Sequence, residues 1–155
     1  MATPDFVLSL REKIGHDELW LPGVTAVVLR GREVLLVRRA DSGAWTPVTG
    51  IVDPGEEPAV AAEREVLEEA DVVARVDSLS WVKAIDLITY PNGDRSRYLD
   101  LVFRCTWVSG DPFPADGENT EAAWFALDAL PEMSVDMSER IRIAVIGAEA
   151  ARFER

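Results

Sequence analysis

Three glutamates stand at positions i, i+3 and i+4 of one short segment: Glu65, Glu68 and Glu69. On an α-helix, side chains at these positions are close neighbours. Like charges at this spacing destabilise an isolated helix by roughly a few tenths of a kcal/mol per pair, unless a positive charge lies among them. A solvated helix face is the ordinary interpretation of such a cluster, and a bound divalent cation is the functional one.

Mg²⁺ is a cation whose chemistry suits a carboxylate cluster, because it takes oxygen ligands and commonly bridges protein carboxylates to substrate phosphates. A metal ion held in this way offsets phosphate charge, lowers the pKa of a bound water and orients it for attack. A neighbouring glutamate that is not fully used as a ligand can accept the proton. Arg64, next to the cluster, is expected to hold one glutamate by a bidentate contact. The reaction class is metal-assisted hydrolysis of a phosphoric anhydride.

Composition limits the partners of this chain of 155 residues, whose length predicts one domain over residues 1–155 with a buried core. The formal net charge of −12 would repel a nucleic-acid polymer or an anionic membrane, so neither is expected as a partner. A small phosphorylated substrate stays compatible with this charge if bound metal inverts the local field. The single cysteine, Cys105, and the lack of a secretory signal or a membrane-length apolar run favour a cytoplasmic location.

Two apolar segments precede the acidic cluster and predict strands. Residues 24–29 and 34–37 are rich in β-branched side chains and are separated by the turn-like residues 30–32. Their nearly unbroken apolar character predicts a hairpin that is covered on both faces. A short amphipathic helix, capped by Thr3 and with Gly15 just past its end, is expected before them.

Two residues near the second of these strands are candidates for substrate binding. Arg38, with its neighbour Arg39, is either solvated at the strand end or a clamp on a phosphate. Trp45 either fills the core or closes over a planar ligand.

The acidic cluster itself is expected on a helix from about Pro58 to Ala70. An apolar stripe with helical spacing marks its buried face. Glu65 and Glu68 fall to one side of this stripe and Glu69 on its border, so the patch is expected where a buried face meets solvent, as in the wall of a cleft. The stripe consists of Ala59, Ala62, Val66 and Ala70.

After residue 72 the hydrophobic pattern takes a period of 2. Segments 79–90 and 98–107 are expected to be strands joined by a tight turn at residues 91–94. Cys105 falls on the core face of the second strand and is expected to be a buried hydrophobe, not a nucleophile. Tyr98 and Asp100 fall on the other face, where they contact either a ligand or solvent. With a last helix capped by Ser134, the element order predicts an α/β fold with a mixed sheet covered on both faces.

The spacing within residues 50–72 resembles the signature of the Nudix hydrolase family. That signature reads Gly, five residues, Glu, seven residues, Arg-Glu-aliphatic-any-Glu-Glu-any-Gly-aliphatic. This chain has Gly50, Glu56 and, from residue 64 to 72, Arg-Glu-Val-Leu-Glu-Glu-Ala-Asp-Val. Every defining position matches except the family glycine, which is Asp71 here. Aspartate tolerates the left-handed conformation better than most residues, so the helix is expected to end normally, at a cost on the order of 1 kcal/mol.

The resemblance implies a Nudix-type α/β/α sandwich and a pyrophosphohydrolase that uses Mg²⁺ or Mn²⁺ on a nucleoside diphosphate linked to another group. ADP-ribose-like compounds and nucleoside triphosphates are the substrate classes that it implies. The alternative is a catalytically silent Nudix-fold nucleotide sensor or interaction module. Homodimers are frequent in the family, so a homodimer is one of the implied assemblies.

The resemblance also implies roles for single residues. Glu68 acts as ligand or base, and Arg64 organises the glutamates. A further glutamate outside the signature often acts as ligand or base in the family, and Glu118 and Glu121 are the candidates here. The implied metal ligands are Glu65, Glu68, Glu69 and, through water, Glu56.

Overall fold

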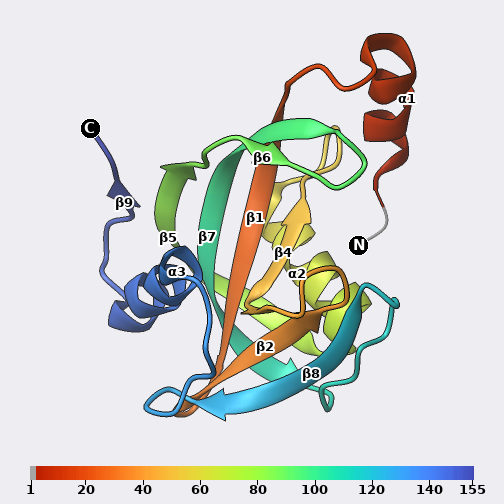
Figure 1. Ribbon diagram of the computed structural model, residues 1–155. Helices are drawn as coiled ribbons and strands as arrows, with labels where there is room; N and C mark the ends of the chain where they lie inside the picture. Colours follow the sequence, from red (N-terminus) through yellow and green to blue (C-terminus); the bar gives the residue numbers. More distant parts are fainter. Residues whose placement is uncertain (1–2) are drawn as a thin grey trace.

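The computed structural model describes residues 3–155, which form a mixed β-sheet with helices on both faces (Figure 1). This is the α/β architecture that the order of elements predicts. The elements are α1 (Asp5–Ile14), β1 (Leu19–Arg30), β2 (Glu33–Arg39), β3 (Trp45–Thr46), β4 (Val48–Ile51), α2 (Pro58–Ala70), β5 (Val73–Ala84), β6 (Ile88–Thr89), β7 (Arg95–Ser109), β8 (Asn119–Ala126), α3 (Val135–Ile146) and β9 (Arg152–Phe153).

Strand β1 lies at the centre of the sheet and pairs in parallel with β7, from Leu19 opposite Ser96 to Leu29 opposite Thr106. The strand order is β3-β2-β1-β7-β5-β9, with β4 also paired to β1, β6 to β7 and β8 to β2. Because β1 and β7 are far apart in the sequence, this central pairing is a long-range feature of the fold.

The alternating side chains of β1 pack into two separate cores. Val24, Ala26 and Val28 pack with the buried face of α2. Val27 and Leu29 pack with the buried face of α3. The two helices therefore cover opposite faces of the sheet, which confirms the prediction drawn from the unbroken apolar run.

The predicted hairpin between β1 and β2 is present but short. Only Leu29 and Arg30 of β1 pair with β2, opposite Val34 and Glu33. From Gly23 to Ala26, β1 pairs with β4 instead. The two strands diverge because each takes another partner. Strand β2 pairs with β8 along its whole length, from Glu33 to Arg39.

Two details differ from the sequence-based expectations. The N-cap of α1 is Pro4, whose carbonyl accepts from the N–H groups of Val7 and Leu8, and not Thr3. The strand expected over 79–90 breaks after Ala84, so the turn at residues 91–94 joins β7 to the two-residue strand β6. No helix within residues 3–155 is long and apolar enough to cross a membrane.

The second face of β7 is also buried, contrary to the expectation that solvent could cover it. Asp100 is 4% exposed and Val102 is fully buried. The cause is α3, whose residues Ile141 and Ala144 pack with Val102. Leu99, which the period of 2 places on the same face as Cys105, is 38% exposed.

Candidate active site

The helix α2 carries the three glutamates and ends at Asp71. This residue adopts the left-handed conformation, with φ 54° and ψ 30°. Its backbone N–H donates to the carbonyl of Leu67 at 3.0 Å, which satisfies one of the last carbonyls of the helix. The expectation that the helix ends normally at Asp71 is confirmed.

Glu65 lies under the backbone of β4. Its side chain is fully buried, and a Cβ placed on Gly50 would lie 2.2 Å from the Glu65 Cδ. A side chain at position 50 and the observed position of Glu65 therefore exclude each other. The expectation that Glu65 lies beside the buried stripe is wrong, because Gly50 leaves room for its carboxyl group within the buried face.

Arg64 binds three acidic side chains, two on α2 and one in the loop before it. The bidentate contact expected of it is made with Glu56, at 2.8 Å to Oε1 and 2.9 Å to Oε2. It also donates to Glu65 Oε1 at 3.0 Å and to Glu68 Oε2 at 3.1 Å. The hydrogen bonds from Arg64 lower the pKa of Glu56, so this carboxylate stays ionised near neutral pH.

Burial acts in the opposite direction on the two inner glutamates. It raises the pKa of Glu65 to about 7, although Arg64 opposes the rise. It also raises the pKa of Glu69, whose Oε2 accepts a hydrogen bond from the Asn119 amide at 3.1 Å. Both carboxyl groups are thus held where their charged form is costly.

A second acidic group forms where α2 meets the segment before β8. Oxygen atoms of Glu69, Asp116 and Glu118 all lie within 4.8 Å of one another. The backbone N–H of Glu118 donates to Asp116 Oδ1 at 3.0 Å, and Gly117 between them has a φ of 81°. This tight turn directs both acidic residues towards Glu69.

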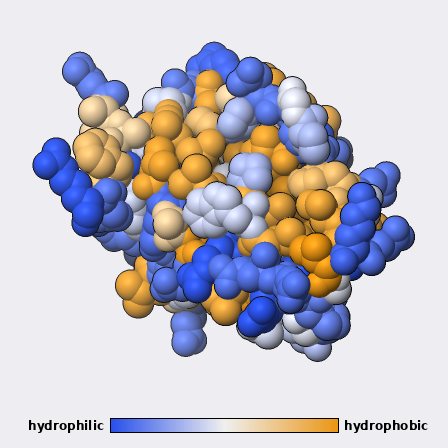
Figure 2. Space-filling model, turned by 90° about the horizontal axis from the view of Figure 1, so that it is seen from above, coloured by the Kyte–Doolittle hydropathy of each residue, from blue (hydrophilic) through white to orange (hydrophobic). Residues whose placement is uncertain are grey.

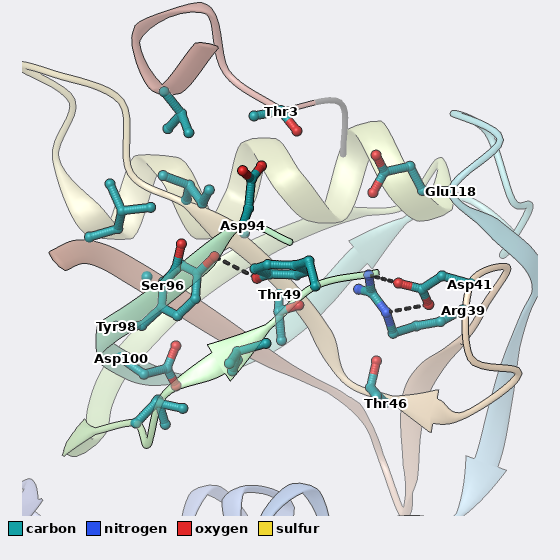
Figure 3. A pocket seen from close by; sticks show the side chains of 18 of the residues that line it. Thr3, Arg39, Asp41, Thr46, Thr49, Asp94, Ser96, Tyr98, Asp100 and Glu118 are labelled. Atoms are coloured by element: carbon teal, nitrogen blue, oxygen red, sulfur yellow. Dashed lines mark hydrogen bonds and ion pairs between the residues drawn. The ribbon is translucent and has the colours of Figure 1, made fainter. Parts of the chain in front are cut away.

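Two members of this group border a cleft of about 780 Å³, which is called the cleft from here on. Glu69 and Glu118 line it together with Arg39, which is held by Asp41 at 3.0 and 2.9 Å. Arg39, Asp41 and Glu118 lie on one side of the cleft, and Tyr98 and Asp100 lie on the other (Figure 3). The cleft therefore joins an acidic end near α2 to a second end on β7.

Among the residues that the sequence offered for substrate binding, Tyr98 lines the cleft, whereas Arg38 and Trp45 do not. The Tyr98 hydroxyl is 2.7 Å from the hydroxyl of Tyr90. Arg38 is not among the residues that line the cleft, and it pairs instead with Glu121 at 2.8 Å. Trp45 packs edge-on against Phe125, with 4.8 Å between ring centroids, and belongs to the core beside α3.

Glu68 faces a different surface from Glu69. With Arg64 and Asp53 it lines a separate hollow of about 440 Å³, and half of its side chain is exposed. The six acidic candidates therefore divide by location. Glu56, Glu65 and Glu68 gather on Arg64, Glu69 and Glu118 lie at the cleft, and Glu121 lies on Arg38.

Two residues of the cleft region, Asp116 and Asn119, were given no role from the sequence, and for Arg39 and Asp100 a solvent-exposed position was left as an alternative. Arg39 lines the cleft where Arg38 does not, because neighbouring strand residues face opposite ways and the pairing of β2 with β8 shifts between these two residues. Asp116 and Asn119 flank Glu118, and this acidic turn was a usable signal. The burial of Asp100 depends on contacts with α3, and the local sequence around Asp100 carries no signal for these contacts.

The carboxylate oxygens of this site are suitable ligands for a divalent cation. Glu65 Oε2 is buried and makes no hydrogen bond within residues 3–155. A buried carboxylate oxygen without a donor is costly, and a cation is the partner that removes the cost. The carboxylate oxygens gathered around Glu69 are the ligand type that Mg²⁺ prefers.

Comparisons with known proteins agree with this geometry. A family model described as NUDIX domain matches residues 19–143. The chain is 33% identical over 130 residues to a protein of Pseudomonas syringae pv. tomato named NAD-capped RNA hydrolase NudC, a match that covers 79% of this chain and 44% of that protein. It is 35% identical over 127 residues to a MutT-like protein of Streptomyces ambofaciens, which covers 81% of this chain and 74% of that protein.

A solved structure shows the same fold. The structure of a NUDIX hydrolase from Nitrosomonas europaea superposes with a TM-score of 0.68 at 27% identity, and covers 83% of this chain and 90% of that chain. The present chain spans less than half the length of the NAD-capped RNA hydrolase that it matches.

Proposed function

Because this chain belongs to the Nudix family, we propose that it hydrolyses the diphosphate linkage of a small nucleoside diphosphate derivative, such as an ADP-ribose-like compound, or of a nucleoside triphosphate. The observation that carries the proposal is the pair of buried carboxylates, Glu65 and Glu69, beside an acidic cleft. Mg²⁺ or Mn²⁺ is the proposed cofactor, with Glu65 and Glu69 as ligands and Glu56 and Glu68 as outer members of the set.

The cation would offset phosphate charge and acidify a coordinated water. Glu118 is placed to accept the proton of the attacking water, because it lines the cleft and lies in the same acidic group as Glu69. Arg39 supplies a guanidinium to the phosphate at the same end of the cleft. Asn119 fixes the orientation of Glu69 through its amide hydrogen bond.

Arg64 acts through other residues. By binding Glu56, Glu65 and Glu68 together, it holds the start of α2 against the loop that precedes the helix. Its positive charge reduces the repulsion among these carboxylates. It is therefore a positioning residue in this proposal.

The name of the Pseudomonas relative points to a capped RNA, and the link between the two nucleotides of NAD is itself a diphosphate. We place the small nucleotide first, because a net charge of −12 opposes the approach of an RNA backbone. The same charge does not exclude a dinucleotide.

The experiment is a panel of nucleoside triphosphates, ADP-ribose and dinucleotides, assayed for released mononucleotide or pyrophosphate with Mg²⁺ and with EDTA. We expect hydrolysis of at least one compound that is lost in EDTA. Nucleotide binding without turnover by any member of the panel would support a silent sensor instead.

A further inference from the structure

Asp100 lies at the end of the cleft away from Glu118. One of its two carboxylate oxygens already accepts hydrogen bonds from the protein. Its Oδ2 accepts from the Thr25 hydroxyl at 2.8 Å and from Arg140 at 3.1 Å. No residue within 3–155 donates to its Oδ1, although the side chain is only 6% exposed. Asp100 lines the cleft, so Oδ1 is an acceptor that a ligand in the cleft can reach.

Gly23 keeps the approach to this oxygen open. It is the strand partner of Asp100 in the parallel pairing of β1 with β7. A Cβ on residue 23 would lie 3.3 Å from Asp100 Oδ1 and 3.3 Å from Tyr98 Cδ1. The lack of a side chain therefore leaves a slot between the tyrosine ring and the carboxylate.

The neighbouring charges balance without a ligand. Arg140 binds Asp136 as well as Asp100, and Lys83 pairs with Asp136. Two acidic and two basic side chains thus form one network without net charge. A neutral hydrogen-bond donor suits Oδ1 better than a cation, which would add an uncompensated charge.

Polar as well as apolar side chains line the cleft around Tyr98, and several of the polar ones bind one another, as Arg11 does with Ser96 and Tyr90 with Tyr98. Leu21, Ile85, Ile88 and Met137 line it together with the ring of Tyr98. Apolar residues also reach the surface at the end of the molecule that carries α1 and β6 (Figure 2). Aliphatic side chains and an aromatic ring beside an open acceptor suit a planar heterocycle with a donor on its edge.

We propose that Asp100 is a specificity-determining residue whose Oδ1 accepts a hydrogen bond from the exocyclic amino group of an adenine-type base. The base enters the slot beside Tyr98 and Gly23, while the diphosphate lies at the end of the cleft near Glu69. This inference rests on the proposed function, because it assigns the base of the same nucleotide substrate.

The test uses AMP and purine riboside 5′-monophosphate, which differ in the amino group. Their dissociation constants are measured by calorimetry on the whole chain in EDTA, so the readout does not depend on turnover. We expect wild type to bind AMP at least about tenfold more tightly, because a site built around one acceptor rejects a ligand without the donor. Equal affinities, or tighter binding of the purine nucleotide, would overturn the inference.

Asp100→Asn exchanges the acceptor for a donor. Its amide oxygen keeps the contacts with Thr25 and Arg140, and its NH₂ group takes the position of Oδ1. The preference for AMP should vanish or reverse. Asp136→Asn is the matched control, because it removes the same charge from the same network and leaves Oδ1 in place. It should keep the preference.

Gly23→Ala provides an independent variant if Asp100→Asn does not fold, since it crowds Oδ1 without changing any charge. It should also reduce the preference for AMP, and an unchanged preference in this variant would contradict the slot. Hydrolysis of ADP-ribose by wild type is measured alongside. Hydrolysis without base preference overturns this inference alone, whereas base preference without hydrolysis of any panel compound overturns the proposed function alone.

Discussion

The carboxyl group of Glu65 occupies the space that a side chain on Gly50 would fill, with 2.2 Å between Cδ and the position of such a Cβ. Gly50 does not have a positive φ, so the need for glycine here is steric and not conformational. The first residue of the Nudix signature and its second glutamate are therefore in direct contact in this chain.

Gly50→Ala should displace Glu65 and lower the free energy of unfolding by about 1–3 kcal/mol, the usual effect of overpacking a core. Urea unfolding measures the loss. The double variant Gly50→Ala, Glu65→Ala should recover most of it, because the clash is removed. Additive effects of the two substitutions would contradict the contact.

Glu65→Gln should stabilise the metal-free protein at alkaline pH. Burial raises the pKa of Glu65 to about 7 from an ordinary value of 4.5. The native state therefore keeps a proton that the unfolded state loses, and the stability of wild type falls as pH rises from 4.5 to about 7.

The variant lacks this loss, so at pH 8 in EDTA it should be more stable than wild type by on the order of 2 kcal/mol. The difference should disappear towards pH 4.5, as measured by urea unfolding across the pH range. Glu57→Gln changes an exposed glutamate near the same helix and serves as the control. Parallel pH profiles for wild type and Glu65→Gln would refute the assignment of this titration.

The same substitution should have different effects on kcat at Glu118 and at Glu121. Glu118→Gln should lower kcat by about 100-fold or more, as expected for loss of a general base. Glu121→Gln should change kcat by less than about threefold, because it only breaks an exposed ion pair with Arg38. Steady-state kinetics on the best substrate of the panel would measure both, and the reverse order of effects would move the base to Glu121.

Asp71→Gly should raise the free energy of unfolding by about 0.5–1 kcal/mol, because glycine adopts the observed φ of 54° without the cost that a Cβ brings. Asp71→Ala should lower it, since alanine is less tolerant of this conformation than aspartate. Thermal unfolding measures both variants. Activity should stay close to wild type in each, because the glutamates precede the helix end.

Cys105 should resist thiol reagents in the folded protein. It is 1% exposed, and burial raises the pKa of its thiol. A higher pKa leaves less thiolate at pH 8, and the thiolate is the reactive form. Ellman's reagent should therefore label Cys105 only after denaturation, and rapid labelling of the native protein would show that β7 opens locally.

The local features of the fold could be predicted from the sequence. The extent of α2, its end at Asp71 and the two-sided cover of β1 follow from periodicity and capping. The inward position of Glu65 could not, because it depends on the absence of a side chain on another strand.

Which of two neighbouring residues faces the cleft also could not be predicted from the sequence. Arg39 faces the cleft and Arg38 does not because the pairing of β2 with β8 shifts between them. Asp100 is buried because Arg140, on a helix that is distant in the sequence, binds its carboxylate. Such contacts depend on tertiary pairing, which periodicity does not specify.

The most direct test of the central claim is Glu69→Gln, a change that keeps the volume of a residue that is 3% exposed at the cleft. Turnover of the best panel substrate and Mn²⁺ binding by electron paramagnetic resonance are measured on the same folded sample. We expect kcat to fall by about 100-fold or more, with Mn²⁺ binding at least about tenfold weaker and an unchanged circular dichroism spectrum. Wild-type turnover and Mn²⁺ affinity in this variant would contradict a metal-dependent hydrolase centred on Glu65 and Glu69.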